Sequence, residues 1–297
     1  MRTTILSIVA CCTLTVSAQN VTITKQIPLL KGVENSAYYP VLSADGTQLL
    51  YTGEGQKGLS LYDFKDDVSI KITDAEQAGL YHNISKDGKI YFITQEKKDG
   101  INFRSVYNYD IRSKKSNVIT SGQRNVMAPQ PLNGGVVVKT SEGLKKTSKD
   151  KSTYVYTENS KVVVGKNGVE KAYSPVESYA GYLWASLSPD ETKVMFFAAG
   201  KGIVIMTLDG KVLNMLGNYE KPVWYGNQYV VAQNATDDGH QYSSSQIILM
   251  KADGSFKKEL TTPTSMTMHP TASAEAGRIV YDTIDGHLFL MELTINE

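Results

Sequence analysis

Residues 39–51 read Tyr-Pro-Val-Leu-Ser-Ala-Asp-Gly-Thr-Gln-Leu-Leu-Tyr, and the chain repeats this pattern along most of its length. A short apolar strand leads into a Ser-x-Asp turn, after which a second apolar strand follows. Asp-Gly is a strong hairpin signal, because Gly adopts a positive φ at little cost and Asp bonds back to its own backbone. Each copy therefore predicts two adjacent antiparallel strands.

The copies recur at a spacing typical of a β-propeller blade. Aligned on the position of Pro40, they fall at residues 40, 82, 129, 185, 222 and 270, which are 37 to 56 residues apart. We predict an all-β chain that forms a six-bladed β-propeller, since a generic two-sheet protein explains the alternation but not the shared period. A second series of apolar segments, the expected third strands, lies at residues 59–63, 106–110, 203–206, 247–250 and 288–291.

Both ends of the chain fit a closed ring. The last copy stops near Leu293, after its third strand, while residues 21–30 alternate in polarity like a strand. If residues 21–30 supply the fourth strand of the last blade, no open sheet edge is left around the ring. We therefore predict one propeller domain over residues 19–297, closed by its N-terminal strand. Residues 141–152 are charged and lysine-rich, and we interpret them as an extended hairpin inside the third blade.

The repeat resembles that of a known family. Its Ser-x-Asp-Gly-Lys pattern, followed by apolar residues and an aromatic residue, is similar to the repeat of the TolB-like propellers, also called WD40-like or PD40 repeats. The match is clear in the copies that begin at residues 39, 81 and 184, and it is looser in the others. The resemblance implies the propeller fold. Some family members partner envelope lipoproteins, which implies a binding role in the cell envelope.

The first eighteen residues predict export. Arg2 supplies a short basic region, residues 5–16 are mostly apolar, and Val16-Ser17-Ala18 offers small residues for cleavage, which is the pattern of a secretory signal peptide. We expect a signal peptide over residues 1–18, cleavage after Ala18, and a periplasmic or secreted protein. The alternative is a lipoprotein, because the stretch that ends at Cys11 resembles a lipidation box.

Charge and composition argue against several partners. The chain has 31 basic and 30 acidic residues, and cleavage after Ala18 would remove Arg2 and leave a neutral chain. A neutral chain argues against nucleic acid or an anionic membrane as the main partner.

The apolar runs of the chain are shorter than the roughly eighteen residues of a membrane span. Both cysteines precede Ala18, so we expect a mature chain without disulfides. We also expect a monomer.

The sequence contains no recognised catalytic, cofactor or metal motif. It has no Gly-x-Ser-x-Gly elbow, no phosphate-binding loop and no His-Glu-x-x-His, so we expect no enzymatic activity and no cofactor. His82 and His269 fall in blades that both flank the first blade, but they occupy adjacent positions of the repeat. Because successive strand residues point to opposite faces, we expect that they do not face the channel together and that no metal is bound.

The position before Pro40 in each copy carries the candidate ligand-binding residues. The innermost strand of each propeller blade lines the central channel, and its first residues lie at one mouth of that channel. Aromatic rings and polar tips at this mouth suit a sugar or a peptide. The alternative is that the aromatic rings pack between blades. The predicted ligand-binding residues are Tyr39, Tyr81, Trp184, Lys221 and His269.

The sequence favours a non-enzymatic binding or scaffold module for a protein, peptidoglycan or glycan of the cell envelope. The alternative function is that of a polysaccharide lyase or hydrolase with a site in the channel. An enzyme would need a titratable group with a shifted pKa that faces the channel beside a second polar group.

Overall fold

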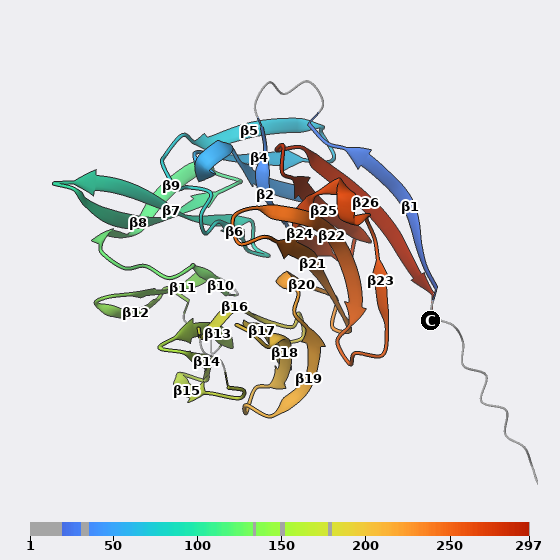
Figure 1. Ribbon diagram of the computed structural model, residues 1–297. Coiled ribbons are helices and arrows are strands. Elements are labelled where there is room, and N and C mark those ends of the chain that lie inside the picture. Colours follow the sequence, from blue (N-terminus) through green and yellow to red (C-terminus); the bar gives the residue numbers. More distant parts are fainter. Residues whose placement is uncertain (1–19, 31–35, 133–134, 149–151, 178–179, 297) are drawn as a thin grey trace, which may run out of the picture.

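The chain folds into a ring of β-sheets. The computed structural model describes residues 20–30, 36–132, 135–148, 152–177 and 180–296, and these residues form seven antiparallel sheets around a common centre (Figure 1). We number the sheets as blades 1 to 7 in chain order of their innermost strands. Each innermost strand contacts the innermost strands of both neighbouring blades, so the ring is closed.

Four-stranded blades whose strands follow one another along the chain make up most of the described ring. They are blade 1, with β2 (Tyr38–Leu42), β3 (Gln48–Thr52), β4 (Leu59–Asp63) and β5 (Val68–Thr73); blade 2, with β6 (Asn83–Ile84), β7 (Lys89–Lys98), β8 (Ile101–Asp110) and β9 (Lys115–Gln123); blade 5, with β16 (Tyr182–Leu187), β17 (Lys193–Ala198), β18 (Gly202–Thr207) and β19 (Val212–Gly217); and blade 6, with β20 (Glu220–Tyr225), β21 (Tyr229–Asp237), β22 (Tyr242–Lys251) and β23 (Lys257–Glu259).

The remaining blades depart from this scheme. Blade 7 takes its fourth strand from the other end of the described chain and consists of β24 (Thr267–Ser273), β25 (Arg278–Thr283), β26 (Leu288–Asn296) and β1 (Asn20–Pro28). Two blades have three strands each, namely blade 3 with β10 (Gln130–Leu132), β11 (Gly135–Thr140) and β12 (Gly143–Lys146), and blade 4 with β13 (Tyr154–Glu158), β14 (Lys161–Lys166) and β15 (Val169–Tyr173). Two short 3-10 turns, η1 (Glu54–Gln56) and η2 (Pro263–Ser265), lie in loops.

The predicted number of six blades is wrong. The interval between Pro129 and Ala185, the longest between copies of the repeat, contains both three-stranded blades instead of one blade with an extended hairpin. Strand β12 pairs with β11, and β13 starts a new sheet with β14. The turn between β13 and β14 is Asn159-Ser160, and both residues have a positive φ. A two-residue hairpin of this kind usually contains Gly. Asn159-Ser160 lacks it, so the sequence gives no hairpin signal at the start of blade 4.

A separate apolar core lies between each pair of neighbouring blades. Successive residues of a strand point to opposite faces, so one blade packs against both of its neighbours: Leu49 lies in the core shared with blade 7, whereas Leu50 lies in the core shared with blade 2. The described residues form seven such clusters, one at each blade junction, including the junction of blade 7 with blade 1. The ring is therefore stabilised at every junction and does not depend on one central core.

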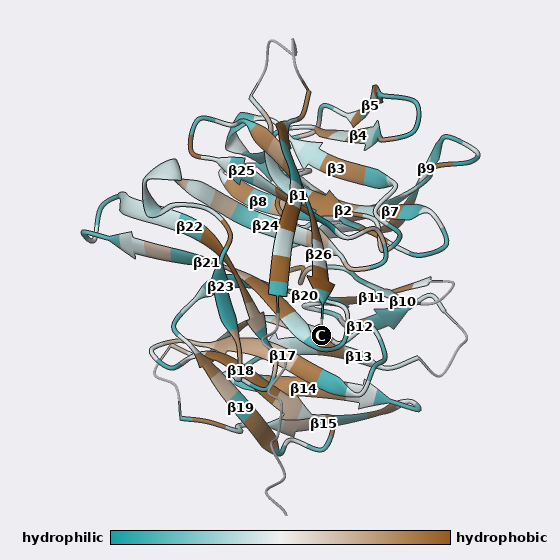
Figure 2. Ribbon diagram, turned by 90° about the vertical axis from the view of Figure 1, so that its right-hand side faces the viewer, coloured by the Kyte–Doolittle hydropathy of each residue, from teal (hydrophilic) through white to brown (hydrophobic). Residues whose placement is uncertain are grey.

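The N-terminal strand closes the last blade, as predicted. Strand β1 pairs antiparallel with β26, from Asn20 opposite Asn296 to Pro28 opposite Phe289. Hydrophobic and hydrophilic bands alternate along β1 (Figure 2). Val21 is buried in the core between blades 6 and 7, and Ile27 packs against the core between blades 7 and 1.

The predicted signal peptide lies outside the described residues. Among the residues that are described, no helix is both long and apolar enough to cross a membrane.

Candidate functional site at one mouth of the channel

Innermost strands of four blades share the same irregularity. In β2, β16, β20 and β24, two residues lie opposite a single residue of the next strand, which is a β-bulge. The bulges are Tyr39-Pro40 opposite Tyr51, Trp184-Ala185 opposite Phe196, Lys221-Pro222 opposite Ala232, and His269-Pro270 opposite Tyr281.

The first residue of each bulge has a left-handed backbone. Its φ is 50° at Tyr39, 53° at Trp184, 48° at Lys221 and 46° at His269. For bulky residues this conformation is uncommon and costs on the order of 1–3 kcal/mol per residue. Proline at the second position suits a bulge, because it needs no ladder partner for an N–H group. A residue-Pro pair accompanies three of the four bulges, and Trp184-Ala185 forms the fourth without proline.

Buried side chains from the preceding blade hold two of these bulges. The backbone N–H of Tyr39 donates to Asp282 Oδ2 at 2.8 Å, and the backbone N–H of His269 donates to Gln233 Oε1 at 3.2 Å. Asp282 and Gln233 are fully buried. They occupy equivalent positions, each paired with the residue just before the bulge of its own blade. The bulges at Tyr39 and His269 are thus anchored by buried polar groups of the second strands.

The four bulge residues surround one cavity. This cavity has a volume of about 210 Å³, and we call it the mouth cavity. Its walls also include the prolines of the bulges, and blade 2 contributes Leu80 and His82.

On one side of the mouth cavity, His269 is held between a ring and a carboxylate. Its imidazole lies against the Tyr39 ring, with centroids 4.2 Å apart, and Nδ1 lies 3.0 Å from both carboxylate oxygens of Asp282. Burial raises the pKa of Asp282, and the hydrogen bond from His269 opposes this rise. Since Asp282 accepts from Nδ1, the neutral imidazole has its lone pair on Nε2. This geometry prepares Nε2 to accept a proton or a hydrogen bond.

On the other side, Lys221 lies over an aromatic face. Its Nζ is 4.7 Å from the centroid of the Trp184 ring, and Trp184 also contacts the ring of Phe197 at 5.1 Å. Burial lowers the pKa of Lys221, although Glu220 and Asp282 oppose this effect at longer range. Among the described residues, no carboxylate forms an ion pair with Lys221.

The structure brings four of the five predicted residues together. Tyr39, Trp184, Lys221 and His269 line the mouth cavity, whereas Tyr81 is exposed and does not, although its neighbours Leu80 and His82 do. A contribution of Tyr81 to binding stays a prediction.

Contrary to the expectation from strand alternation, His82 and His269 line the same cavity. The bulge at His269 breaks the alternation on which that expectation depended. His82 is buried, with Nδ1 3.0 Å from Gly79 O and Nε2 2.9 Å from Tyr39 O. Within the described residues, no group of three or more His, Cys, Asp or Glu side chains could hold a metal ion.

Sequence reasoning missed the two anchors of the bulges. Asp282 ends the apolar run Ile279-Val280-Tyr281, and Gln233 follows Val230-Val231-Ala232. A polar residue at the same place in two otherwise apolar second strands was the available signal.

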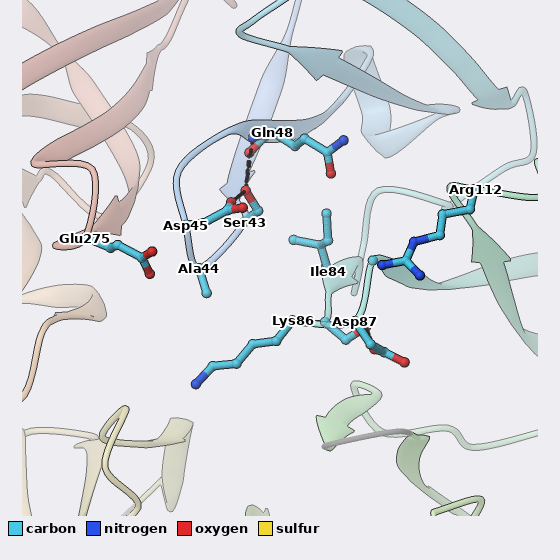
Figure 3. A pocket seen from close by; sticks show the side chains of 11 residues that line it. Ser43, Ala44, Asp45, Gln48, Ile84, Lys86, Asp87, Arg112 and Glu275 are labelled. Atoms are coloured by element: carbon cyan, nitrogen blue, oxygen red, sulfur yellow. Dashed lines mark hydrogen bonds between the residues drawn. The ribbon is translucent and has the colours of Figure 1, made fainter.

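A second cavity, of about 370 Å³, lies beside the Ser-x-Asp turns that follow the innermost strands of blades 1 and 2 (Figure 3). Two of its carboxylates are engaged in those turns, since Ser43 Oγ donates to Asp45 at 2.6 Å and Ser85 Oγ donates to Asp87 at 2.5 Å, and Glu275 also lines it. The same bond recurs from Ser188 to Asp190 at 2.6 Å. These aspartates fix turns, which leaves the mouth cavity as the stronger candidate site.

Comparison with known proteins supports the fold alone. No protein-family model and no curated protein matches the sequence. Among solved structures, TolB from Acinetobacter baumannii has a TM-score of 0.55 and 16% identity over 80% of this chain, which spans 57% of the TolB chain. A chain in the crystal structure of a mitotic checkpoint complex has a TM-score of 0.60 and 8% identity, with 98% of each chain covered. An oligogalacturonate lyase in complex with manganese has a TM-score of 0.50 and 12% identity over 87% of this chain and 78% of its own. The resemblance to TolB-like and WD40-type proteins therefore extends to the β-propeller fold.

Proposed function

We propose that this chain is an exported binding propeller that engages a protein, peptidoglycan or glycan of the cell envelope at the mouth cavity. One observation carries the proposal: four blades use the same left-handed bulge to direct Tyr39, Trp184, Lys221 and His269 to one cavity. Backbone strain that recurs at equivalent positions is characteristic of functional sites. This strain costs free energy and so does not itself stabilise the ring.

The size of the cavity indicates what part of a ligand enters it. Pockets that enclose a whole drug-sized ligand have volumes of about 300–1,000 Å³, and the mouth cavity has about 210 Å³. It therefore fits the end group of a larger molecule, with the rest of that molecule lying across the face of the propeller.

A thermal-shift screen tests this proposal. The purified protein is screened against oligosaccharides and muropeptides, because a ligand at a hundredfold excess over its Kd adds about 2.7 kcal/mol of stability. We expect Trp184→Ala to abolish the shift. The matched control is Tyr219→Ala, which removes another ring beneath a lysine, Lys257, 5.7 Å from the ring centroid. Full binding by Trp184→Ala would place the site elsewhere, and Tyr81→Ala tests whether contacts extend beyond the cavity.

Export is part of the proposal and has its own test. N-terminal sequencing of the protein from the periplasm or medium is expected to give Gln19 as the first residue. A lipid on Cys11 would support the lipoprotein alternative, and retention of Met1 in the cytoplasm would contradict export.

A second candidate function, that of a polysaccharide lyase or hydrolase, is favoured by the pairing of His269 with Asp282. A buried carboxylate that orients an imidazole is an arrangement suited to general-base chemistry. Incubation with acidic and neutral polysaccharides, followed by chromatography of the products, tests it. Turnover that is lost in His269→Ala would establish catalysis, whereas intact polysaccharide would leave binding as the function.

A further inference from the structure

We propose that the group recognised in the mouth cavity is a carboxylate, bound by Lys221 Nζ. This inference rests on the proposed function, because it names the chemistry of the ligand at that same site. It follows from the charges that surround the cavity and from the faces of its aromatic rings.

The negative charges near the mouth cavity already have partners. Asp282 accepts hydrogen bonds from His269 Nδ1 and from the Tyr39 N–H. Glu220, the residue before Lys221, accepts a hydrogen bond from the Tyr242 hydroxyl at 3.1 Å. Among the described residues, the ammonium of Lys221 is left with the Trp184 ring as its neighbour.

A partly buried ammonium without an ion-pair partner is unfavourable. The Trp184 face compensates in part, since a cation over an aromatic ring is attracted by the ring quadrupole. An anionic group that enters the cavity would form the ion pair that Lys221 lacks.

The aromatic faces argue against a neutral sugar as the recognised group. Stacking of a sugar requires a free ring face, but the Tyr39 ring lies against His269, and Trp184 contacts Lys221 and Phe197. The two rings therefore position the two polar side chains, which leaves less of their faces for a sugar. The donor left to face an anionic ligand is Lys221 Nζ, whereas His269 Nε2 can accept a hydrogen bond from a neighbouring hydroxyl or amide of the same ligand.

A carboxylate fits Lys221 Nζ at this site better than a phosphate does. Phosphate sites generally combine several backbone N–H groups, arginine or a helix N-terminus. Here two backbone N–H groups of the bulges, at Tyr39 and His269, are already bonded to Asp282 and Gln233. One ammonium matches the single charge of a carboxylate, and the cavity of about 210 Å³ matches an end group.

The carboxylate could belong to a uronic acid of a glycan or to a peptide of peptidoglycan. The probes are therefore sodium glucuronate and muramyl dipeptide, each compared with its neutral counterpart, the glucuronate methyl ester and the dipeptide with its carboxylates amidated. Binding is measured by ligand-observed NMR and calorimetry with the full protein. Which of the two acids binds identifies the source.

We expect at least one acid to bind and its neutral counterpart to bind at least about tenfold more weakly, because a hydrogen bond to a charged group contributes about that factor or more. Lys221→Met is expected to cause a similar loss, and added salt to weaken binding of the acid only. The matched control is Lys257→Met, which removes the exposed lysine over Tyr219 and is expected to leave affinity unchanged.

The outcomes separate this inference from the proposed function. If neutral and acidic probes bind equally and Lys221→Met binds like the wild type, the proposed recognition of a carboxylate is overturned. Binding at the mouth cavity, which is the proposed function, then still stands. If neither acid binds the wild-type protein, the inference is overturned as well. A melting curve of Lys221→Met shows that a loss of binding does not come from unfolding.

Discussion

His82 makes the stability of the propeller depend on pH in a direction that can be predicted. The imidazole is buried between blades 1 and 2, and burial lowers its pKa to about 4, although its contacts with the Gly79 and Tyr39 carbonyls oppose the change. In an unfolded chain the pKa of a histidine is about 6.5. Because the folded-state pKa is lower, the unfolded chain binds more protons between these values. The stabilisation from a neutral His82 is therefore complete above about pH 6.5 and is lost as the pH falls toward about 4.

The size of the effect follows from the two pKa values. Each pH unit below about 6.5 reduces the free energy of unfolding by roughly 1.4 kcal/mol, so about 2 kcal/mol is lost between pH 7 and pH 5. The assay is urea unfolding of the wild type and of His82→Gln at several pH values. Gln stays neutral and its amide can donate to one of the two carbonyls, so the stability difference between the two proteins isolates the titration of His82.

The prediction would be refuted by a change of the opposite sign in the stability difference between the wild type and His82→Gln. A neutral imidazole has one N–H, whereas His82 faces two carbonyl oxygens at 3.0 and 2.9 Å. If the wild type gains stability relative to His82→Gln on acidification, His82 is an imidazolium that donates to both carbonyls, and the reasoning from burial is wrong. His240→Gln, which removes an exposed histidine, controls for the substitution itself.

Three further predictions concern the site and the ring. Lys221→Met is expected to raise the melting temperature of the ligand-free protein, because burial lowers the pKa of Lys221 and so disfavours its charged form at neutral pH; a lower melting temperature would contradict this. Deletion of residues 20–28 is expected to lower the free energy of unfolding by several kcal/mol, since it removes buried Val21 and opens the edge of β26. The measurement is urea unfolding, and an unchanged midpoint would contradict closure by β1. Gly168→Ala is expected to cost about 1–2 kcal/mol in urea unfolding, because Gly168 has a φ of 80° in the turn between β14 and β15 and a side chain there would meet open space; equal stability would argue against that turn.

Much of the site could be anticipated because it repeats. The residue-Pro pairs at Tyr39, Lys221 and His269 mark one position in three copies of the repeat, and Trp184 falls at the same position by alignment. Tyr81 shares the alignment but lacks the bulge, and it does not line the mouth cavity. Alignment of the copies thus located the mouth, whereas the bulge decided which side chains enter it.

The blade count could have been improved from the sequence in one place. Asn167-Gly168 is a strong hairpin signal between residues 161–166 and 169–173, and it lies within the interval that was assigned to a single blade. The preceding turn, Asn159-Ser160, carries no such signal.

The sequence by itself determined the strands of the clear repeats, the Ser-x-Asp turns and the closing role of β1, because these depend on alternation and turn chemistry within a few neighbouring residues. Only the tertiary structure decided that the ring has seven blades and that Asp282 and Gln233 hold the bulges. Those features depend on the register between strands and on contacts between blades. The unpaired charge at Lys221 is likewise a property of the assembled ring, since Trp184 and Asp282 come from other blades, and the Tyr242 hydroxyl that bonds Glu220 comes from another strand.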